Sequence, residues 1–159
     1  MPLLPTETQW LGLIGSTSVV QARRLPLNSR MARNELLDER LTYSIIGAFF
    51  EVYNYLGYGF LEHIYKSALE RELRARGHQV RREVYVLVLY KGEQIGRQRI
   101  DMIVDDRVIV EVKSTRALDS VAPRQLYNYL HATTLKVGLL LHFGPKANYE
   151  RSVCTDARR

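Results

Sequence analysis

Hydrophobic residues recur at helical spacing in two segments of the first half of the chain. Between residues 35 and 56 they fall three or four positions apart, which is typical of a helix with one buried face. Residues 57–59, Gly-Tyr-Gly, interrupt the pattern, and the same spacing resumes over residues 61–73. Gly77 then offers the left-handed residue that commonly ends a helix. The sequence therefore predicts two helices ahead of any strand.

The pattern then changes to that of β-strands. Residues 80–90 are rich in β-branched and aromatic side chains, and residues 91–93 form a turn signal. Residues 95–104 and 108–113 continue the β pattern. We therefore expect three consecutive strands joined as a meander.

A third helix and a fourth strand are predicted after a loop. Pro123 suits the first turn of a helix expected at residues 125–135. Residues 137–143 are almost all apolar, as in a strand buried on both faces. Because a helix leads into this strand, we expect it to lie parallel to residues 108–113. The predicted fold class is α/β, with a small mixed β-sheet flanked by helices.

The first thirty residues differ from the rest of the chain. They contain Pro2, Pro5 and Pro26, a single acid, and no sustained hydrophobic period. We interpret residues 1–30 as a tail and residues 31–159 as one domain. Two alternatives stay open: a targeting peptide bearing Arg and Ser, or a translated leader ahead of a natural start at Met31. The leader is the interpretation that we prefer.

Composition narrows the class of protein. The chain has 159 residues, of which 46% are hydrophobic, enough for the core of one domain. Its 23 basic and 17 acidic residues give a net charge of +6, which favours an anionic partner such as nucleic acid, although the same excess could serve solubility alone. No apolar run approaches the ~20 residues of a membrane span, so we expect a soluble, cytoplasmic protein without a membrane partner.

The single cysteine limits the chemistry further. Cys154 cannot form an internal disulfide or supply the thiolate set of a zinc or iron–sulfur site. We expect it to be an inert residue of a C-terminal tail.

Candidate chemistry lies in the second and third predicted strands, which carry Asp101 and the sequence Glu111-x-Lys113. Strand side chains alternate between faces, so Glu111 and Lys113 point the same way. Carboxylates are the ligands that Mg²⁺ prefers, and a cation between two acids keeps both ionised. Lys113 could orient an attacking water or offset charge on a phosphoryl group. The pattern indicates phosphodiester hydrolysis with Mg²⁺ or Mn²⁺.

The turn between these strands decides whether the two acids meet. A two-residue loop at Asp105 and Asp106 would pair Asp101 with Val110 and place Asp101 and Glu111 on opposite faces. A three-residue loop, or a bulge, would pair Asp101 with Glu111 directly. We predict the second arrangement.

The chain also resembles a known family over residues 41–143. Gly59-Phe60-Leu61-Glu62-His63-Ile64-Tyr65 fits the G-x-x-E-x-x-Y signature of the bacterial GxxExxY proteins, a group within the PD-(D/E)XK nuclease superfamily. Gln125 to Tyr129 is similar to the Q-x-x-x-Y element of RecB-like nucleases. One departure is mild: Asp101 follows Ile100, where the superfamily is named for a Pro.

The resemblance implies a restriction-endonuclease-like core and a role for each matching residue. Asp101 and Glu111 would bind the metal together with the main-chain carbonyl of Val112, and Lys113 would be the catalytic lysine. Glu62 would face the site from its helix and bind metal or a metal-bound water. Substrate contacts would come from Gln125 and Tyr129, four residues apart on one helical face.

Two functions follow from these observations. The leading hypothesis is a metal-dependent nuclease that hydrolyses DNA or RNA. The alternative is a non-catalytic module that binds nucleic acid or protein and keeps the nuclease fold, since fold alone does not establish activity. The motifs do not separate DNA from RNA or endonuclease from exonuclease action, and they leave a homodimer open.

Overall fold

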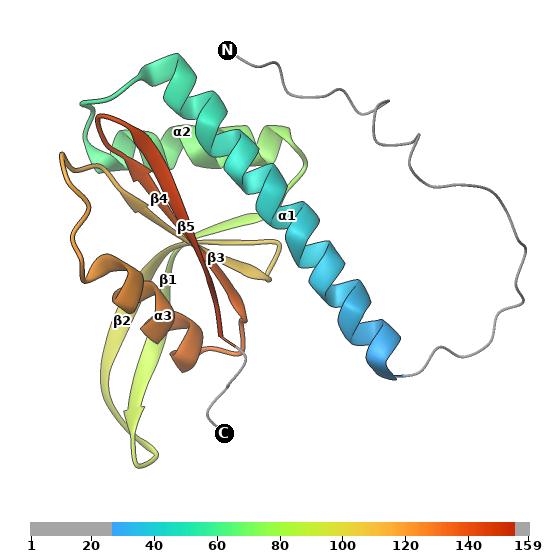
Figure 1. Ribbon diagram of the computed structural model, residues 1–159. Coiled ribbons are helices and arrows are strands. Elements are labelled where there is room, and N and C mark those ends of the chain that lie inside the picture. The colour runs from blue at the N-terminus through green and yellow to red at the C-terminus, as the bar shows by residue number, and fades with distance from the viewer. Residues whose placement is uncertain (1–26, 155–159) are drawn as a thin grey trace, which may run out of the picture.

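The structure, a computed structural model, describes residues 27–154 and the side chains from Asp38 onward. Three helices and five strands make up this part of the chain (Figure 1). In chain order they are α1 (Leu27–Leu56), α2 (Glu62–Ala75), β1 (Val80–Tyr90), β2 (Glu93–Val104), β3 (Val108–Lys113), α3 (Ala122–Ala132), β4 (Val137–Phe143) and β5 (Ala147–Val153).

The five strands form one mixed sheet in the order β1-β2-β3-β4-β5. All neighbouring pairs are antiparallel except β3 and β4, which are parallel and joined through α3. The predicted meander of three strands and the parallel return of β4 are therefore confirmed. Helices cover both faces: α1 and α2 lie on one side of the sheet and α3 on the other (Figure 1).

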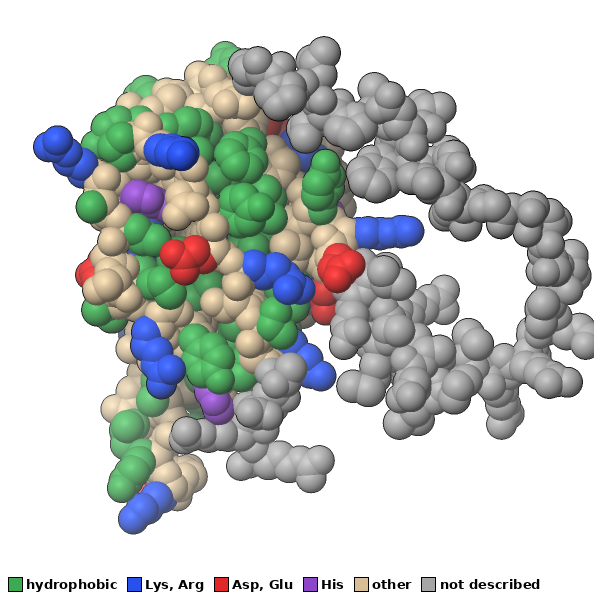
Figure 2. Space-filling view, viewed as in Figure 1, with side chains coloured by type: hydrophobic (Ala, Val, Ile, Leu, Met, Phe, Trp, Pro, Cys, Tyr) green, Lys and Arg blue, Asp and Glu red, His purple; other side chains and the backbone are tan. Residues whose placement is uncertain are grey.

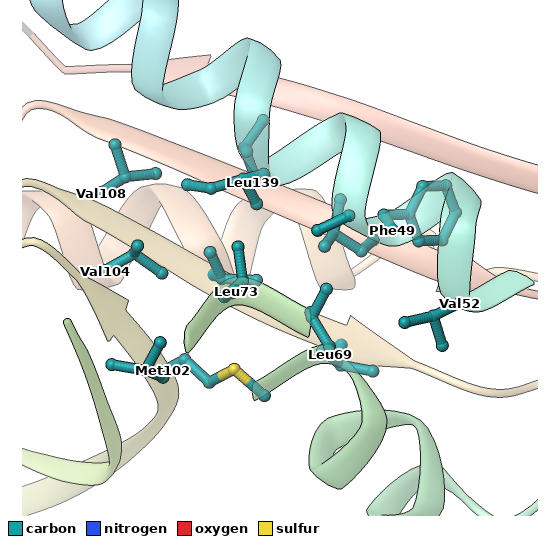
Figure 3. Packing of buried hydrophobic residues seen from close by; sticks show 14 of the residues in the cluster. Phe49, Val52, Leu69, Leu73, Met102, Val104, Val108 and Leu139 are labelled. Carbon is teal, nitrogen blue, oxygen red and sulfur yellow. The ribbon is translucent and has the colours of Figure 1, made fainter. Parts of the chain in front are cut away.

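The main hydrophobic core lies between the sheet and the helices α1 and α2. Figure 3 shows Phe49 and Val52 of α1 and Leu69 and Leu73 of α2 gathered over side chains of β2, β3 and β4. A second cluster on the opposite face joins Leu126 of α3 to the sheet. Burial of apolar side chains in both layers explains why β4 and the first half of β3 are apolar on both faces.

Strands β1 and β2 exchange faces at the level of Asp101. Met102 belongs to the core under α1 and α2, whereas Ile100, two residues earlier, belongs to the cluster under α3. Regular alternation would place both side chains on one face. Glu83 stands opposite Asp101 between two paired positions and has a left-handed backbone, with φ of 53°. Asp101 therefore lies where the β1–β2 hairpin twists, within reach of both helical layers.

The strand β5 was not predicted. Most of its residues are exposed, so its sequence carries no hydrophobic alternation, and only its backbone pairing with β4 defines it. Cys154 follows β5 directly and is buried, with its amide donating to the Lys136 carbonyl oxygen at 2.8 Å. The expectation that Cys154 is a tail residue was wrong, because this edge strand carries it back against the α3 layer.

Two helix boundaries differ from the predictions. The helix α1 begins at Leu27 instead of residue 35, in a segment rich in good helix formers but without a clear hydrophobic period. The helix α3 runs three residues earlier than expected, because Pro123 lies within its first turn and Thr133 is already extended. Residues 1–26 of the predicted tail lie outside the described residues, and residues 27–30 open α1. None of the described helices is long and apolar enough to cross a membrane.

Gly138 sets the distance between β4 and α3. A Cβ atom at this position would lie 2.7 Å from Cδ1 of Leu126, closer than the packed layers allow. We expect Gly138→Ala to lower the free energy of unfolding by about 1–3 kcal/mol, because Leu126 must leave its packed position. Urea denaturation measures the change. Gly96→Ala is the matched strand control, since its Cβ would meet nothing within 4 Å; equal losses in both variants would contradict the close-approach explanation.

Candidate active site

The register of β2 and β3 brings Asp101 and Glu111 together. Val104 pairs with Val108 and Met102 with Val110, so the next positions along the two strands are Asp101 and Glu111. The connection has three residues, as predicted. Asp105 and Asp106 adopt left-handed backbones with φ of 51° and 54°, a conformation that Asp tolerates better than most residues. The turn thereby fixes both acids on one side of the hairpin.

Asp101 is buried and both of its carboxylate oxygens have partners. Oδ2 accepts a hydrogen bond from the amide of Val112 at 2.9 Å, and Oδ1 lies 2.5 Å from Nζ of Lys66. This hydrogen bond from the Val112 amide holds Asp101 against β3, one residue beyond Glu111. Sequence analysis assigned the Val112 carbonyl to a metal; the structure shows its amide in contact with Asp101, and the carbonyl's role stays a prediction.

Lys66 is the residue of the site that sequence analysis missed. Its ammonium lies between Asp101 and Glu62, with Nζ 2.7 Å from Oε1 of Glu62. Burial lowers the pKa of Lys66, but the hydrogen bonds to Asp101 and Glu62 outweigh it and raise the pKa above 10.5. The Glu62-x-x-x-Lys66 spacing, which puts both side chains on one helical face, was the available signal.

The loop before α2 is held by Tyr65, the last residue of the G-x-x-E-x-x-Y sequence. Its ring is fully buried and stacks on Phe143 with centroids 4.2 Å apart. Its hydroxyl donates to the Gly57 carbonyl oxygen at 2.7 Å and accepts from the Phe60 amide at 3.2 Å. These contacts fix the start of α2 and with it Glu62. The signature tyrosine is thus a structural residue that places the acid.

Glu111 is the most deeply buried charged residue of the site, with 3% of its surface exposed. Its Oε1 accepts a hydrogen bond from Nζ of Lys113 at 3.1 Å. Its Oε2 is buried without a hydrogen-bond partner among the described residues. Burial, and then the negative charge of Asp101, raise the pKa of Glu111 to about 7, although Lys113 opposes the shift. Glu111 therefore presents one oxygen that a ligand could satisfy.

Gln125 and Tyr129 approach the site from α3. The Gln125 side-chain amide donates to the Tyr129 hydroxyl at 2.7 Å. Burial, followed by the charge of Glu111, raises the pKa of Tyr129, which indicates that the phenol lies near that carboxylate. The predicted pair is therefore brought to the same side of the sheet as Glu111, and a role in substrate binding stays a prediction.

The acids do not form a three-carboxylate cluster. Among the described side chains, residues 38–154, no group of three or more His, Cys, Asp or Glu is arranged to hold a metal ion. Asp101, Glu111 and Lys113 converge, whereas Glu62 is linked to them through the Lys66 ammonium. The site thus pairs three acids with two lysines. That Glu62, Asp101 and Glu111 bind a metal stays a prediction.

Comparisons with known proteins assign the chain to a family. A family model described as the PD-(D/E)XK nuclease superfamily matches residues 39–152, a range that includes every residue of the site. A crystal structure of SSO0001 is similar with 21% identity and a TM-score of 0.48, covering 60% of this chain and 52% of its own. The chain thus spans about half the length of that solved structure. No curated protein matches the chain. The mixed sheet with its three helices is a restriction-endonuclease-like α/β fold.

Proposed function

The chain belongs to the PD-(D/E)XK nuclease superfamily, whose members usually hydrolyse phosphodiester bonds, and from this we propose that it is a metal-dependent nuclease centred on Asp101, Glu111 and Lys113. The observation that carries the proposal is the Oε2 atom of Glu111. It is a buried acceptor without a partner in the described part of the chain, next to a second carboxylate. We also assign the chain to the GxxExxY group, on the basis of Gly59, Glu62 and Tyr65.

The donor set fits a hard divalent cation such as Mg²⁺ or Mn²⁺. Asp101 and Glu111 would supply carboxylate oxygens from adjacent strands, with the Val112 carbonyl as a further ligand, and Glu62 would join them once it leaves the Lys66 ammonium. A bound cation would ionise Glu111 at neutral pH and lower the pKa of a bound water. This explains how a carboxyl group with a pKa of about 7 would serve as a ligand.

Lys113 and the α3 pair would handle the substrate. The Lys113 ammonium is held by Glu111 at 3.1 Å and stands at the exposed end of β3, where it can orient a water and offset charge on the phosphoryl group. Tyr129 and Gln125 would position the phosphate backbone. The substrate is nucleic acid, and the test is cleavage of single- and double-stranded DNA and RNA by the purified protein with Mg²⁺ or Mn²⁺. Absence of cleavage on all four substrates would reject the proposal.

One observation supports a second candidate, a binding module without catalysis. Lys66 already neutralises Glu62 and Asp101, as a structural ion pair would. This alternative predicts salt-sensitive nucleic-acid binding that is unchanged in Asp101→Asn, and no calorimetric signal with Mn²⁺. Metal binding that is lost in Asp101→Asn would exclude it.

Replacing Lys66 tests whether its ammonium competes with the metal. We expect Lys66→Gln to bind Mn²⁺ about tenfold more tightly, because a unit charge beside two metal-binding carboxylates would be removed. Isothermal titration calorimetry measures the affinity. Lys136→Gln, an exposed lysine between α3 and β4, is the control and should bind as the parent does. Weaker binding in Lys66→Gln would mean that Lys66 orients the carboxylates instead of competing for them.

A further inference from the structure

A groove of about 830 Å³ lies between the β1–β2 hairpin and α3, apart from the carboxylates. Its hairpin wall includes Leu87, Leu89 and Lys91, and its helical wall includes Arg124 and Tyr127. The hairpin projects beyond the body of the sheet beside α3 (Figure 1). Figure 2 shows hydrophobic side chains along this projection and a basic side chain at its tip. The groove is thus an open surface with apolar and basic walls.

The charges of the groove suit an anion. Lys91 and Arg124 are exposed, and among the described residues that line the groove there is no acid. Among the side chains described, residues 38–154, no ion pair joins either cation to an acid. Both cations instead lie against aromatic rings: Arg124 is 5.3 Å from the centre of the Tyr127 ring, and Lys91 is 5.4 Å from that of Tyr90.

The aromatic groups favour unpaired bases over a duplex. Tyr127 is half-buried, and the ring of His131 meets it edge-on at 5.4 Å, which holds the tyrosine in place. Tyr90 is 60% exposed at the hairpin end. Aromatic side chains beside cations are typical of sites for single-stranded nucleic acid, because unpaired bases stack on the rings while the cations contact phosphates. Bases within a duplex are already stacked on one another.

The groove and the candidate active site share the helix α3. Arg124 and Asn128 line the groove, and each is followed by a residue of the pair Gln125 and Tyr129. The eleven residues of α3 span about 16 Å, which corresponds to about five nucleotides at the ~3.4 Å spacing of a stacked strand and to fewer in an extended one. A strand in the groove would therefore follow the helix that borders the carboxylates.

We propose that the groove between the β1–β2 hairpin and α3 binds single-stranded nucleic acid and leads it to the carboxylates. This rests on the proposed function and deepens it, because it names the class of substrate. Arg124 and Lys91 contact phosphates, and Tyr127 stacks on a base.

The test is fluorescence anisotropy of the full chain with labelled dT16 and a labelled 16-base-pair duplex, in EDTA so that metal-dependent cleavage does not interfere. We expect the parent protein to bind dT16 more tightly than the duplex. The Arg124→Ala/Tyr127→Ala variant should lose about tenfold or more in affinity for dT16. Arg124→Ala alone should reduce the salt dependence by about 0.7 in the slope of log affinity against log salt.

Matched controls separate the groove from general effects. Tyr149→Ala/Arg151→Ala removes the same two residue types from β5 and should bind dT16 as the parent does. Tyr127→Phe keeps the ring and should keep the affinity. Should the double variant fail to fold, Arg124→Glu alone changes an exposed side chain and must still weaken binding. Affinities within twofold of the parent for the groove variants would overturn the proposal, as would equal binding of the duplex.

The same measurements distinguish this inference from the proposed function. Loss of dT16 binding in the groove variants of a protein that never cleaves would support the groove and reject the nuclease. Cleavage by a protein whose groove variants bind dT16 normally would support the nuclease and reject the groove. If sedimentation shows that Arg124→Glu changes only self-association and leaves dT16 binding intact, the groove contacts a second copy of the chain and the proposal fails.

Discussion

Replacing Lys113 with alanine is expected to lower the rate of phosphodiester cleavage by about 10²- to 10³-fold, while the protein stays folded. The ammonium of Lys113 would be aimed at the place where charge develops on the phosphoryl group, and removing one such group typically costs that much. The Lys113 side chain is partly exposed, and its ammonium has Glu111 as its one partner among the described residues, so its loss removes little packing. The measurement is single-turnover cleavage of a labelled oligonucleotide with saturating Mn²⁺.

Lys146→Ala removes an exposed lysine from the turn between β4 and β5 and is the matched control, expected to cleave at the parental rate. Thermal unfolding of both variants shows whether the fold is kept. Binding of uncleaved oligonucleotide in EDTA should change little in Lys113→Ala, because the lysine is proposed to act in the transition state. Cleavage at the parental rate by Lys113→Ala would place the activity elsewhere on the chain or in a contaminant.

The position of the candidate site could be predicted because it depends on local rules. Alternation along β3 puts Glu111 and Lys113 on one face, and the length of a turn sets the register of a hairpin. Asp101 and Glu111 could therefore be paired from sequence once a three-residue loop was assumed. Two aspartates in left-handed conformation at Asp105 and Asp106 make that loop acceptable.

Other parts of the site depend on contacts between distant segments and gave no local signal. The pair between Lys66 and Glu62 follows from their i,i+4 spacing, but the pair between Lys66 and Asp101 requires the first turns of α2 to pack beside β2, which no spacing in α2 encodes. The left-handed backbone of Glu83 lies where the β1–β2 hairpin changes faces beside Asp101. A glutamate within a strand pattern does not predict such a conformation. The edge strand β5 is mostly exposed, so its hydrophobic pattern did not predict a strand.

The Glu111→Gln variant is expected to keep the stability that the parent protein loses as pH rises. The pKa of Glu111 is about 7 in the folded protein against 4.5 as the ordinary value, so the folded state holds this proton more tightly than the unfolded state. The free energy of unfolding therefore falls as pH rises from about 4.5 to 7, by up to about 3 kcal/mol at 1.36 kcal/mol per pKa unit. Glutamine has nearly the same shape and never ionises.

The measurement is urea denaturation of parent and Glu111→Gln in EDTA between pH 5 and pH 8. The difference between the two proteins isolates Glu111, because the other titrating groups are common to both. We expect the stability of the variant relative to the parent to rise up to about pH 7 and to level off towards pH 8. Glu150→Gln, at an exposed residue of β5, should show no such rise. Parallel curves for parent and Glu111→Gln would show that the carboxyl group is not destabilised by burial.

Adding Mn²⁺ at pH 8 should reverse the order of stability. A cation that binds only the folded parent stabilises it by mass action, and it also removes the cost of ionising Glu111. The Glu111→Gln variant has lost a carboxylate ligand, so it should gain little from the metal and should not cleave. Greater stability without metal and lost activity with it would then have one cause: a buried carboxyl group that a metal, and not the fold, keeps ionised. If Mn²⁺ stabilises both proteins equally, Glu111 is no metal ligand.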